Sequence, residues 1–353
     1  MPLSVLAGSA SPLNRKTTVM PSLDLTYLNG PDVAALALTD DEILAAVEGG
    51  LRAQGMGETV LEPRVHLVPE SSAKGHFNVL RGVVAPLGVA GVKVVGDFVD
   101  NWKRGLPSEL AVLTLFDPET GAPRAILDAS VLTDMRTGAM SALGAKHLAR
   151  RGAKVLAHIG ARGTAYWNVR LIDHLFDCSE IRVHSRRPES RREFADRLSH
   201  DLGKPVVATD DWESCVRGAD IVVEASRLPE PQPLLHTDWI KPGALVIPYG
   251  TMSAVEITLT DIMSKIVVDD WGQCRKGMPF GSLRRHVDEG RLHEGNLHAE
   301  LGEIVAGSKP GRERDDETIL FWHRGLSTSD IALGCALLDK AKRMGRGQTL
   351  RFQ

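Results

Sequence analysis

The chain has 353 residues, of which 43% are hydrophobic and 25% charged, the composition of an ordinary globular protein with room for two domains. Its formal net charge of −3 gives no field that would attract nucleic acid, and no apolar run is long enough to cross a membrane. The four cysteines are scattered and form no CxxC pair, which favours reduced thiols in the cytoplasm. We expect neither a nucleic-acid partner nor a bound metal.

The first third of the chain predicts a mixed region of strands and helices. Residues 1–20 carry two basic residues after a mildly apolar start, the reverse of a secretory signal, so we expect a loose extension there. An amphipathic helix is expected at residues 40–54. Strands are expected at residues 25–28, 64–68, 76–81, 91–95, 111–117 and 125–127. This pattern predicts an antiparallel α+β region.

The second region begins with a long alanine-rich helix, expected at residues 132–151 and ended by Gly152. Strands and helices alternate after it, which predicts a parallel sheet covered by helices. The expected strands are residues 155–159, 181–184, 206–208, 221–224, 245–248 and 266–268, and the helices begin near residues 164, 192 and 212. A last amphipathic helix is expected at residues 327–341, and residues 346–353 are expected to form a loose tail.

A glycine turn follows the strand expected at residues 155–159. Strand, glycine turn and helix begin a dinucleotide-binding unit, because glycine lets the backbone approach the pyrophosphate and the helix N-terminus offers free N–H groups. The usual second glycine is Arg162 here, so the motif by itself also fits a structural turn. The expected cofactor contacts in this turn are Gly160, Arg162, Gly163, Thr164 and Ala165.

The end of the next expected strand indicates which dinucleotide binds. About 25 residues after Gly160, where an NAD-binding fold usually places an acid for the ribose hydroxyls, the chain reads His184-Ser185-Arg186-Arg187. A serine followed by arginines suits a 2′-phosphate, and an ordinary basic loop is the alternative. We therefore expect NADP(H) to be preferred, with NAD(H) possible, and Ser185, Arg186 and Arg187 to contact it.

Several separated segments together resemble the ornithine cyclodeaminase/μ-crystallin family. They are Pro63-Arg64, residues 91–95 (GVKVV), 105–107 (GLP), 132–142 (LTDMRTGAMSA), the Gly160 turn, and residues 299–307 (AELGEIVAG), 310–312 (PGR), 315–318 (DDET) and 325–330 (GLSTSD). The resemblance covers nearly the whole chain. It implies an α/β protein with a Rossmann-type parallel sheet in residues 136–319. It also implies an α+β domain for substrate binding and homodimer formation, built from residues 1–135 with 320–353.

The resemblance limits the chemistry without fixing the reaction. The family contains lyases and reductases that act on small amino or imino acids with a nicotinamide cofactor. Their shared step is hydride transfer at the carbon that bears the nitrogen. Cyclodeaminases oxidise ornithine to an imine, lose ammonia after ring closure and then reduce the ring, whereas relatives only reduce an imine or oxidise an amine.

Three basic residues, Arg64, Lys93 and Arg136, match the substrate-binding positions of the family. An α-imino acid has a carboxylate, which a planar guanidinium can hold with two hydrogen bonds. Lys93 interrupts an otherwise apolar strand, and Arg136 lies on a helix that must pack, so neither reads as a solvated surface charge. Lys93 can also donate a proton to the imine. His76 and Arg81 are further candidates for this pocket, with a structural role as the alternative for His76.

The cofactor contacts are completed by Thr137, through the resemblance, and by Ser226. The catalytic candidates are Lys93 and Thr251. Thr251 stands where cyclodeaminases carry an aspartate, and its hydroxyl can hydrogen-bond an ammonium or imine but cannot act as a carboxylate base. This departure weakens the cyclodeaminase reading.

Three functions fit the sequence. The first is an NADP-dependent oxidoreductase that reduces a small α-imino acid or runs the reverse amine oxidation. The second is an ornithine cyclodeaminase in which Asp269 or Asp270 replaces the missing carboxylate. The third is a μ-crystallin-like protein that holds NADPH or another ligand without catalysis. The presence of Arg64, Lys93 and Arg136 favours an enzyme over such a binding protein.

Overall fold

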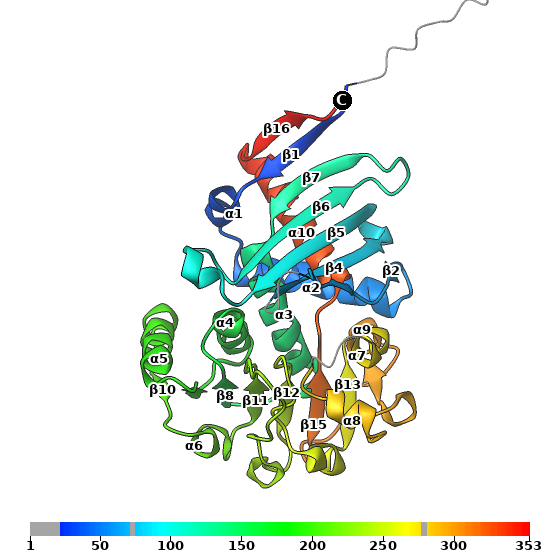
Figure 1. Ribbon diagram of the computed structural model, residues 1–353. Coiled ribbons are helices and arrows are strands. Elements are labelled where there is room, and N and C mark those ends of the chain that lie inside the picture. The colour runs from blue at the N-terminus through cyan, green and yellow to red at the C-terminus, as the bar shows by residue number, and fades with distance from the viewer. Residues whose placement is uncertain (1–21, 71–74, 277–280) are drawn as a thin grey trace, which may run out of the picture.

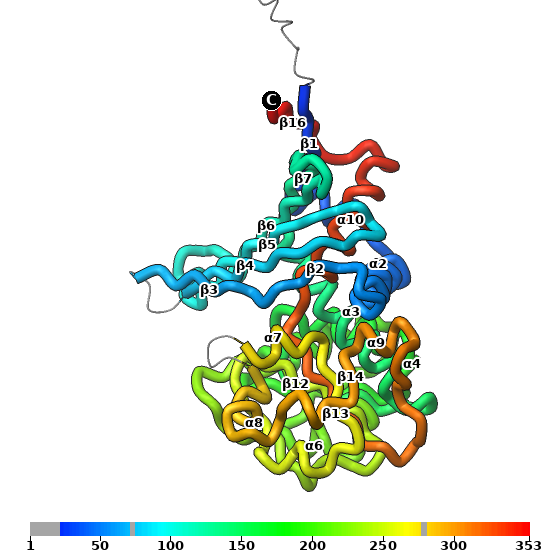
Figure 2. The backbone as a smooth tube through the Cα atoms, turned by 90° about the vertical axis from the view of Figure 1, so that its right-hand side faces the viewer, coloured from blue at the N-terminus to red at the C-terminus, as the bar shows by residue number. Residues whose placement is uncertain are grey.

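The computed structural model describes residues 22–70, 75–276 and 281–353, and these residues build two sheets in two lobes (Figure 1). The extension expected at residues 1–20 lies outside them. Figure 2, turned by 90°, shows the same lobes one above the other with α3 (Ser130–Leu148) at their junction. Among the described residues, no helix is both long and apolar enough to cross a membrane.

The first lobe holds a sheet in the order β16-β1-β7-β6-β5-β4-β2, with β3 also paired to β4. Its pairs are antiparallel except for β1 with β7. The strands are β1 (Asp24–Leu28), β2 (Thr59–Leu61), β3 (Val65–Leu67), β4 (Gly75–Val84), β5 (Val89–Phe98), β6 (Glu109–Phe116), β7 (Pro123–Asp128) and β16 (Gln348–Arg351). The helices of this lobe are α1 (Gly30–Leu36), α2 (Asp40–Gly55) and α10 (Ser327–Met344).

The last helix packs on the first sheet. It contacts β4, β5 and β6, and its Gly334 lies so close to β6 that a Cβ there would be 2.4 Å from the Leu113 side chain. One face of the sheet is thus covered by α10, and alternate residues of β5 point into that contact. Lys93 is one of them.

The second lobe holds a sheet in the order β10-β9-β8-β11-β12-β15-β13-β14, in which every pair is parallel. Its strands are β8 (Val155–Ile159), β9 (Glu180–His184), β10 (Val206–Ala208), β11 (Ile221–Glu224), β12 (Leu245–Pro248), β13 (Lys265–Val268), β14 (Ala299–Glu300) and β15 (Ile319–Trp322). The helices are α4 (Ala165–Phe176), α5 (Pro188–Leu202), α6 (Trp212–Val216), α7 (Trp271–Arg275), α8 (Arg284–Asp288) and α9 (Leu301–Ala306). The predicted fold class, a Rossmann-type sheet with an α+β region, is confirmed.

Two expectations about the last forty residues were wrong. The expected loose tail contains β16, which pairs with β1 from Asp24 opposite Arg351 to Tyr27 opposite Gln348. The predicted return to the first domain at residue 320 falls inside β15, which pairs with β12 and β13. The chain therefore leaves the second sheet only after Trp322.

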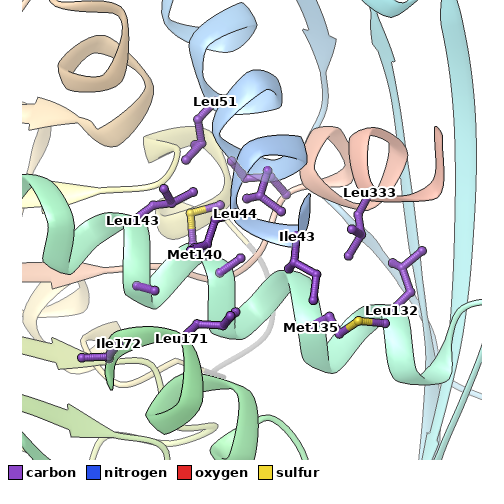
Figure 3. Packing of buried hydrophobic residues seen from close by; sticks show 14 of the residues in the cluster. Ile43, Leu44, Leu51, Leu132, Met135, Met140, Leu143, Leu171, Ile172 and Leu333 are labelled. Atoms are coloured by element: carbon purple, nitrogen blue, oxygen red, sulfur yellow. The ribbon is translucent and has the colours of Figure 1, made fainter. Parts of the chain in front are cut away.

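The junction of the lobes is a continuous hydrophobic core around α3 (Figure 3). Leu132 and Met135 pack with α2 and α10, while Met140 and Leu143 continue the contact further along the helix. Small residues let the neighbouring elements approach: a Cβ on Gly138 would lie 2.5 Å from the backbone of Trp167 in α4. The alanine-rich composition that predicts a helix here therefore also allows it to be buried on several sides.

The crossing of α2 with α9 gives a stability prediction. A Cβ on Gly55 would lie 1.9 Å from the carbonyl oxygen of Gly302, and backbone cannot rotate away. We expect Gly55→Ala to lower the free energy of unfolding by about 1–3 kcal/mol through overpacking. Gly49→Ala, on the same helix with open space around it, should instead stabilise by about 0.4–1 kcal/mol. Urea denaturation of both variants checks this, and equal stabilities would contradict the close crossing.

Candidate active site

The glycine turn lies at the carboxyl end of β8, between β9 and β11, where the strand order of the second sheet reverses. Ligands of parallel sheets bind at such a point. Gly160 has φ +112°, and a Cβ on it would lie 2.8 Å from the carbonyl oxygen of Ala225. Only glycine fits this cradle, and α4 begins directly after it at Ala165. The turn has the geometry that a dinucleotide needs, with Arg162 exposed at its tip.

A buried network of polar side chains is hydrogen-bonded to the glycine turn. The hydroxyl of Tyr249 lies 2.5 Å from that of Thr164 and accepts a hydrogen bond from the Asn168 amide. Asn168 also contacts His158, whose other ring nitrogen lies 3.0 Å from the carbonyl oxygen of Gly160. Burial raises the pKa of Tyr249, so its hydroxyl stays neutral. Sequence reasoning missed Tyr249, which follows β12 without any motif of its own.

The basic segment after β9 lies beside this turn, because Gly160 donates its N–H to the carbonyl oxygen of His184 at 2.8 Å. Arg186 and Arg187 are exposed, and within the described part of the chain neither guanidinium forms an ion pair. Ser185 donates its hydroxyl to the carbonyl oxygen of Arg187. The structure therefore leaves both guanidinium groups available to a ligand at the end of β9.

A buried charge cluster occupies the other side of the junction. Lys93 of β5 is fully buried, and its Nζ donates to the Oδ1 atom of Asp330 at 2.5 Å and to the Thr133 hydroxyl at 3.1 Å. Arg136 of α3 donates its Nε to the same Asp330 oxygen at 2.8 Å. Burial lowers the pKa of Lys93 to about 7, and the Arg136 guanidinium acts in the same direction against the attraction of Asp330.

Arg64 reaches the junction from the segment before β3. It donates one Nη2 group to the backbone carbonyls of Arg324 and Gly325, the latter at 3.1 Å. Burial lowers its pKa to about 9, with Arg324 and Arg136 adding to the shift. Gly325 has φ +89°, and a Cβ there would lie 2.2 Å from the Arg136 guanidinium. Arg64 and Arg136 therefore both border Gly325.

Asp134 connects this cluster to the glycine turn. Its Oδ1 atom lies 3.9 Å from where a Cβ of Gly163 would be. Burial raises the pKa of Asp134 to about 6, while Arg136 and Lys93 oppose that rise. The basic cluster and the glycine turn thus both lie against the first two turns of α3. Thr137, one turn along the same helix, is buried and bonds back to Thr133.

Two predicted pocket residues take different places. Arg81 is opposite Val92 in the β4–β5 register, whereas Lys93 is opposite Leu80, so Arg81 lies on the other face of the sheet, where it pairs with Glu62. The expectation that Arg81 shares the pocket of Lys93 was wrong. His76 lies on the same face of the sheet as Lys93, and the centroid of its ring lies 5.5 Å from that of the His66 ring.

Thr251 and Ser226 follow neighbouring strands of the second sheet. The Thr251 N–H donates to the carbonyl oxygen of Ser226 at 3.1 Å, and both hydroxyls are buried without a hydrogen-bond partner among the described residues. Such groups are rare in folded proteins unless a ligand or water satisfies them. Their position is compatible with a polar ligand at the carboxyl ends of β11 and β12.

The carboxylate beside Gly250 and Ser226 is the buried Glu224, which accepts the Ser226 N–H at 2.7 Å and the Ser282 hydroxyl at 3.2 Å. The other carboxylates that could replace an aspartate at Thr251 are bonded elsewhere. Asp269 accepts backbone N–H groups from Arg324 and Gly325 at 2.8 and 2.7 Å. Asp270 caps α7 by accepting from Gln273, and Glu256 bonds to the Thr237 N–H and to His236. Among the described residues, no three His, Cys, Asp or Glu side chains are grouped so as to hold a metal ion.

The structure combines a Rossmann-type sheet, whose turn after β8 only glycine fits, with a buried basic cluster on a second sheet. The family model for ornithine cyclodeaminase/mu-crystallin matches residues 27–345, so the chain belongs to that family. This confirms the predicted resemblance.

Three solved structures show the same fold. An archaeal alanine dehydrogenase, a dimer with bound NAD, is 28% identical at a TM-score of 0.86, covering 94% of this chain and 100% of its own. The Δ1-pyrroline-2-carboxylate reductase of Thermococcus litoralis, in complex with NADH and L-proline, is 28% identical at a TM-score of 0.84. The match covers 92% of this chain and 100% of the reductase. The iminosuccinate reductase of Paracoccus denitrificans, in complex with NAD+, is 25% identical at a TM-score of 0.83. The match covers 93% of this chain and 99% of the reductase.

Proposed function

We propose that this protein is an NADP-preferring oxidoreductase that reduces a small α-imino acid, or oxidises the corresponding amino acid in reverse. The observation that carries the proposal is the buried contact of Lys93 and Arg136 with Asp330, beside the part of α3 from which Asp134 approaches the glycine turn. Burying two cations is costly, and such clusters concentrate at functional sites. The three similar structures are enzymes of this chemical class with NAD bound, which supports the same class here.

The side chains suit the steps of imine reduction. Arg64 and Arg136 have guanidinium nitrogens beyond those already bonded, and these hold the substrate carboxylate. The nicotinamide, when bound, supplies the hydride to the imine carbon. Lys93 gives its Nζ proton to the imine nitrogen, a role that a pKa near 7 favours because the group both holds and releases a proton near neutral pH. The Thr251 hydroxyl is the further hydrogen-bonding group for that nitrogen.

The decisive assay follows NADPH and NADH oxidation with a panel of cyclic imines and with 2-oxo acids plus amines. Turnover with at least one α-imino acid is expected. Ammonia and proline formed from ornithine at a comparable rate would instead support the cyclodeaminase. The structure gives that alternative little support, because Asp269, Asp270 and Glu256 are bonded elsewhere.

The cofactor preference gives a separate prediction. Because no carboxylate precedes Glu189 after β9, and charge-assisted hydrogen bonds contribute roughly 1.5–3 kcal/mol each, NADPH should bind at least about tenfold more tightly than NADH. Arg186→Asp combined with Arg187→Ala should weaken NADPH and spare NADH. Arg151→Ala is the control, because Arg151 is exposed and precedes the amino end of β8, whereas the glycine turn follows its carboxyl end. Fluorescence titration measures the affinity of each of the three proteins for both cofactors, and equal wild-type affinities would contradict the assignment.

We also propose a homodimer through the first lobe, in the cytoplasm. The outer face of its sheet exposes Phe77, Val94 and Val112 by 36%, 38% and 49%, around a groove of about 460 Å³. Exposed apolar patches of this kind mark protein interfaces. Light scattering at micromolar concentration should give the mass of two chains, and a monomer would exclude this arrangement.

The proposed location in the cytoplasm rests on the cysteines. The thiols of all four cysteines are free, which supports a reducing compartment.

A further inference from the structure

Arg324 is a half-buried cation that the proposed reaction leaves unused. It follows β15 and lies next to Gly325, against which Arg136 packs. Its Nη1 group is buried and has no hydrogen-bond partner among the described residues. An arginine with an unsatisfied buried N–H group is costly, so such a group in a ligand site calls for an anionic partner.

The nearby carboxylate does not meet this need. Asp269 accepts the backbone N–H groups of Arg324 and Gly325 on one oxygen, and the N–H of Asp270 and the thiol of Cys274 on the other. Its charge still attracts the Arg324 guanidinium, while Arg284 repels it. The Asp269 carboxylate thus attracts the Arg324 guanidinium without a hydrogen bond to it, and the Nη1 group of Arg324 remains available to donate.

A second unsatisfied donor lies at the same corner. Trp322 is fully buried, and its indole Nε1 has no partner among the described residues. A Cβ on Gly281 would lie 3.0 Å from the Cζ2 atom of Trp322 and 3.5 Å from Nη1 of Arg324, so both side chains border Gly281. The N–H of Gly281 in turn donates to the carbonyl oxygen of Thr251 at 2.7 Å. Two open N–H donors therefore lie beside the expected nitrogen-binding threonine.

These donors are separate from the carboxylate clamp already described. Arg64 donates to the backbone carbonyl oxygen of Arg324, and Arg136 borders Gly325. One carboxylate is satisfied by Arg64 and Arg136 together. A further anionic group on the same substrate would be needed for Arg324, and a planar carboxylate matches a guanidinium.

We propose that Arg324 and Trp322 bind a second carboxylate, so that the substrate of this enzyme is a dicarboxylic α-imino acid or the corresponding acidic amino acid. This inference rests on the proposed function, since it names the substrate class of the same site.

The test compares mono- and dicarboxylic substrates. Wild-type enzyme is assayed with NADPH and ammonia plus pyruvate, oxaloacetate or 2-oxoglutarate, and with Δ1-pyrroline-2-carboxylate. The expected kcat/KM is at least about tenfold higher for a dicarboxylic imine, the effect of one or two charge-assisted hydrogen bonds. Arg324→Leu should remove this preference while changing kcat/KM for monocarboxylic substrates by less than about threefold. Arg324→Lys should keep part of it.

Arg285→Leu is the matched control, because Arg285 is an exposed arginine of α8 paired with Glu289. Melting temperature and NADPH affinity report whether each variant is folded. A wild-type preference for monocarboxylic substrates would overturn the proposal. Equal losses on both substrate classes in Arg324→Leu would also overturn it, because they would make Arg324 part of the first clamp.

A binding measurement separates this proposal from the proposed function. With NADP+ bound, L-aspartate or L-glutamate should raise the melting temperature of the wild type more than L-alanine does, and Arg324→Leu should lose that difference. If no imine is turned over, the proposed function fails, and this shift alone decides whether the acid pocket exists. No shift with either acidic amino acid would refute the pocket.

Discussion

Replacing Lys93 by methionine should reduce imine reduction by at least about 10²-fold while leaving NADPH affinity nearly unchanged. General acid catalysis contributes typically about 10²–10⁴-fold, and methionine fills a similar volume without a proton to donate. Lys93 lies on β5 of the first sheet, whereas the glycine turn belongs to the second. NADPH oxidation and fluorescence titration measure the two effects separately.

The pH dependence adds a signature that a packing defect would not produce. The protonated amine is the acid, so wild-type kcat/KM should be level at low pH and fall as the pH rises through about 7. Residual activity of Lys93→Met should lack this limb. Lys103→Met, an exposed lysine, should behave as wild type. Reduction that survives Lys93→Met with the limb intact would assign the acid to another group.

Much of the fold was readable because local patterns and the final structure agree. The Gly160 turn joins a strand and a helix in the order expected, and its positive φ explains why glycine stands there. Lys93 stood out because a charge within an apolar strand must be satisfied by something. Its partner, however, is 237 positions away along the chain, and no spacing rule connects them. Asp330 was quoted within a family segment but was not assigned a role.

The wrong predictions have identifiable physical causes. Which face a strand residue occupies depends on register, and a shift of one position reverses it, so Arg81 could not be placed from the sequence of β4 alone. The tail looked loose because β16 is exposed along its whole length and has no apolar alternation. Its backbone pairing with β1 depends on the position of a strand more than 300 residues earlier.

Asp330 gives the prediction with the largest expected effect on stability. It is fully buried near the start of α10 and is the counter-charge of both Lys93 and Arg136. Removing one partner of a buried charge cluster leaves the others uncompensated, so Asp330→Asn should lower the free energy of unfolding by about 3–5 kcal/mol. Asp339→Asn, an exposed position on the same helix, should change it by less than about 0.5 kcal/mol. Urea denaturation at pH 6, where Lys93 is mostly protonated, measures both.

A double-mutant cycle separates the charge effect from general loss of packing. If Lys93 is the group left uncompensated, Lys93→Met should lessen the cost of Asp330→Asn, with a coupling of about 0.5–3 kcal/mol. The direction in which Asp330→Asn shifts the pH dependence of activity is also fixed. Asp330 favours the charged form of Lys93, so without it the pKa of Lys93 falls further and the falling limb of kcat/KM moves to lower pH. Additive stabilities together with an unmoved limb would show that Asp330 does not act through Lys93.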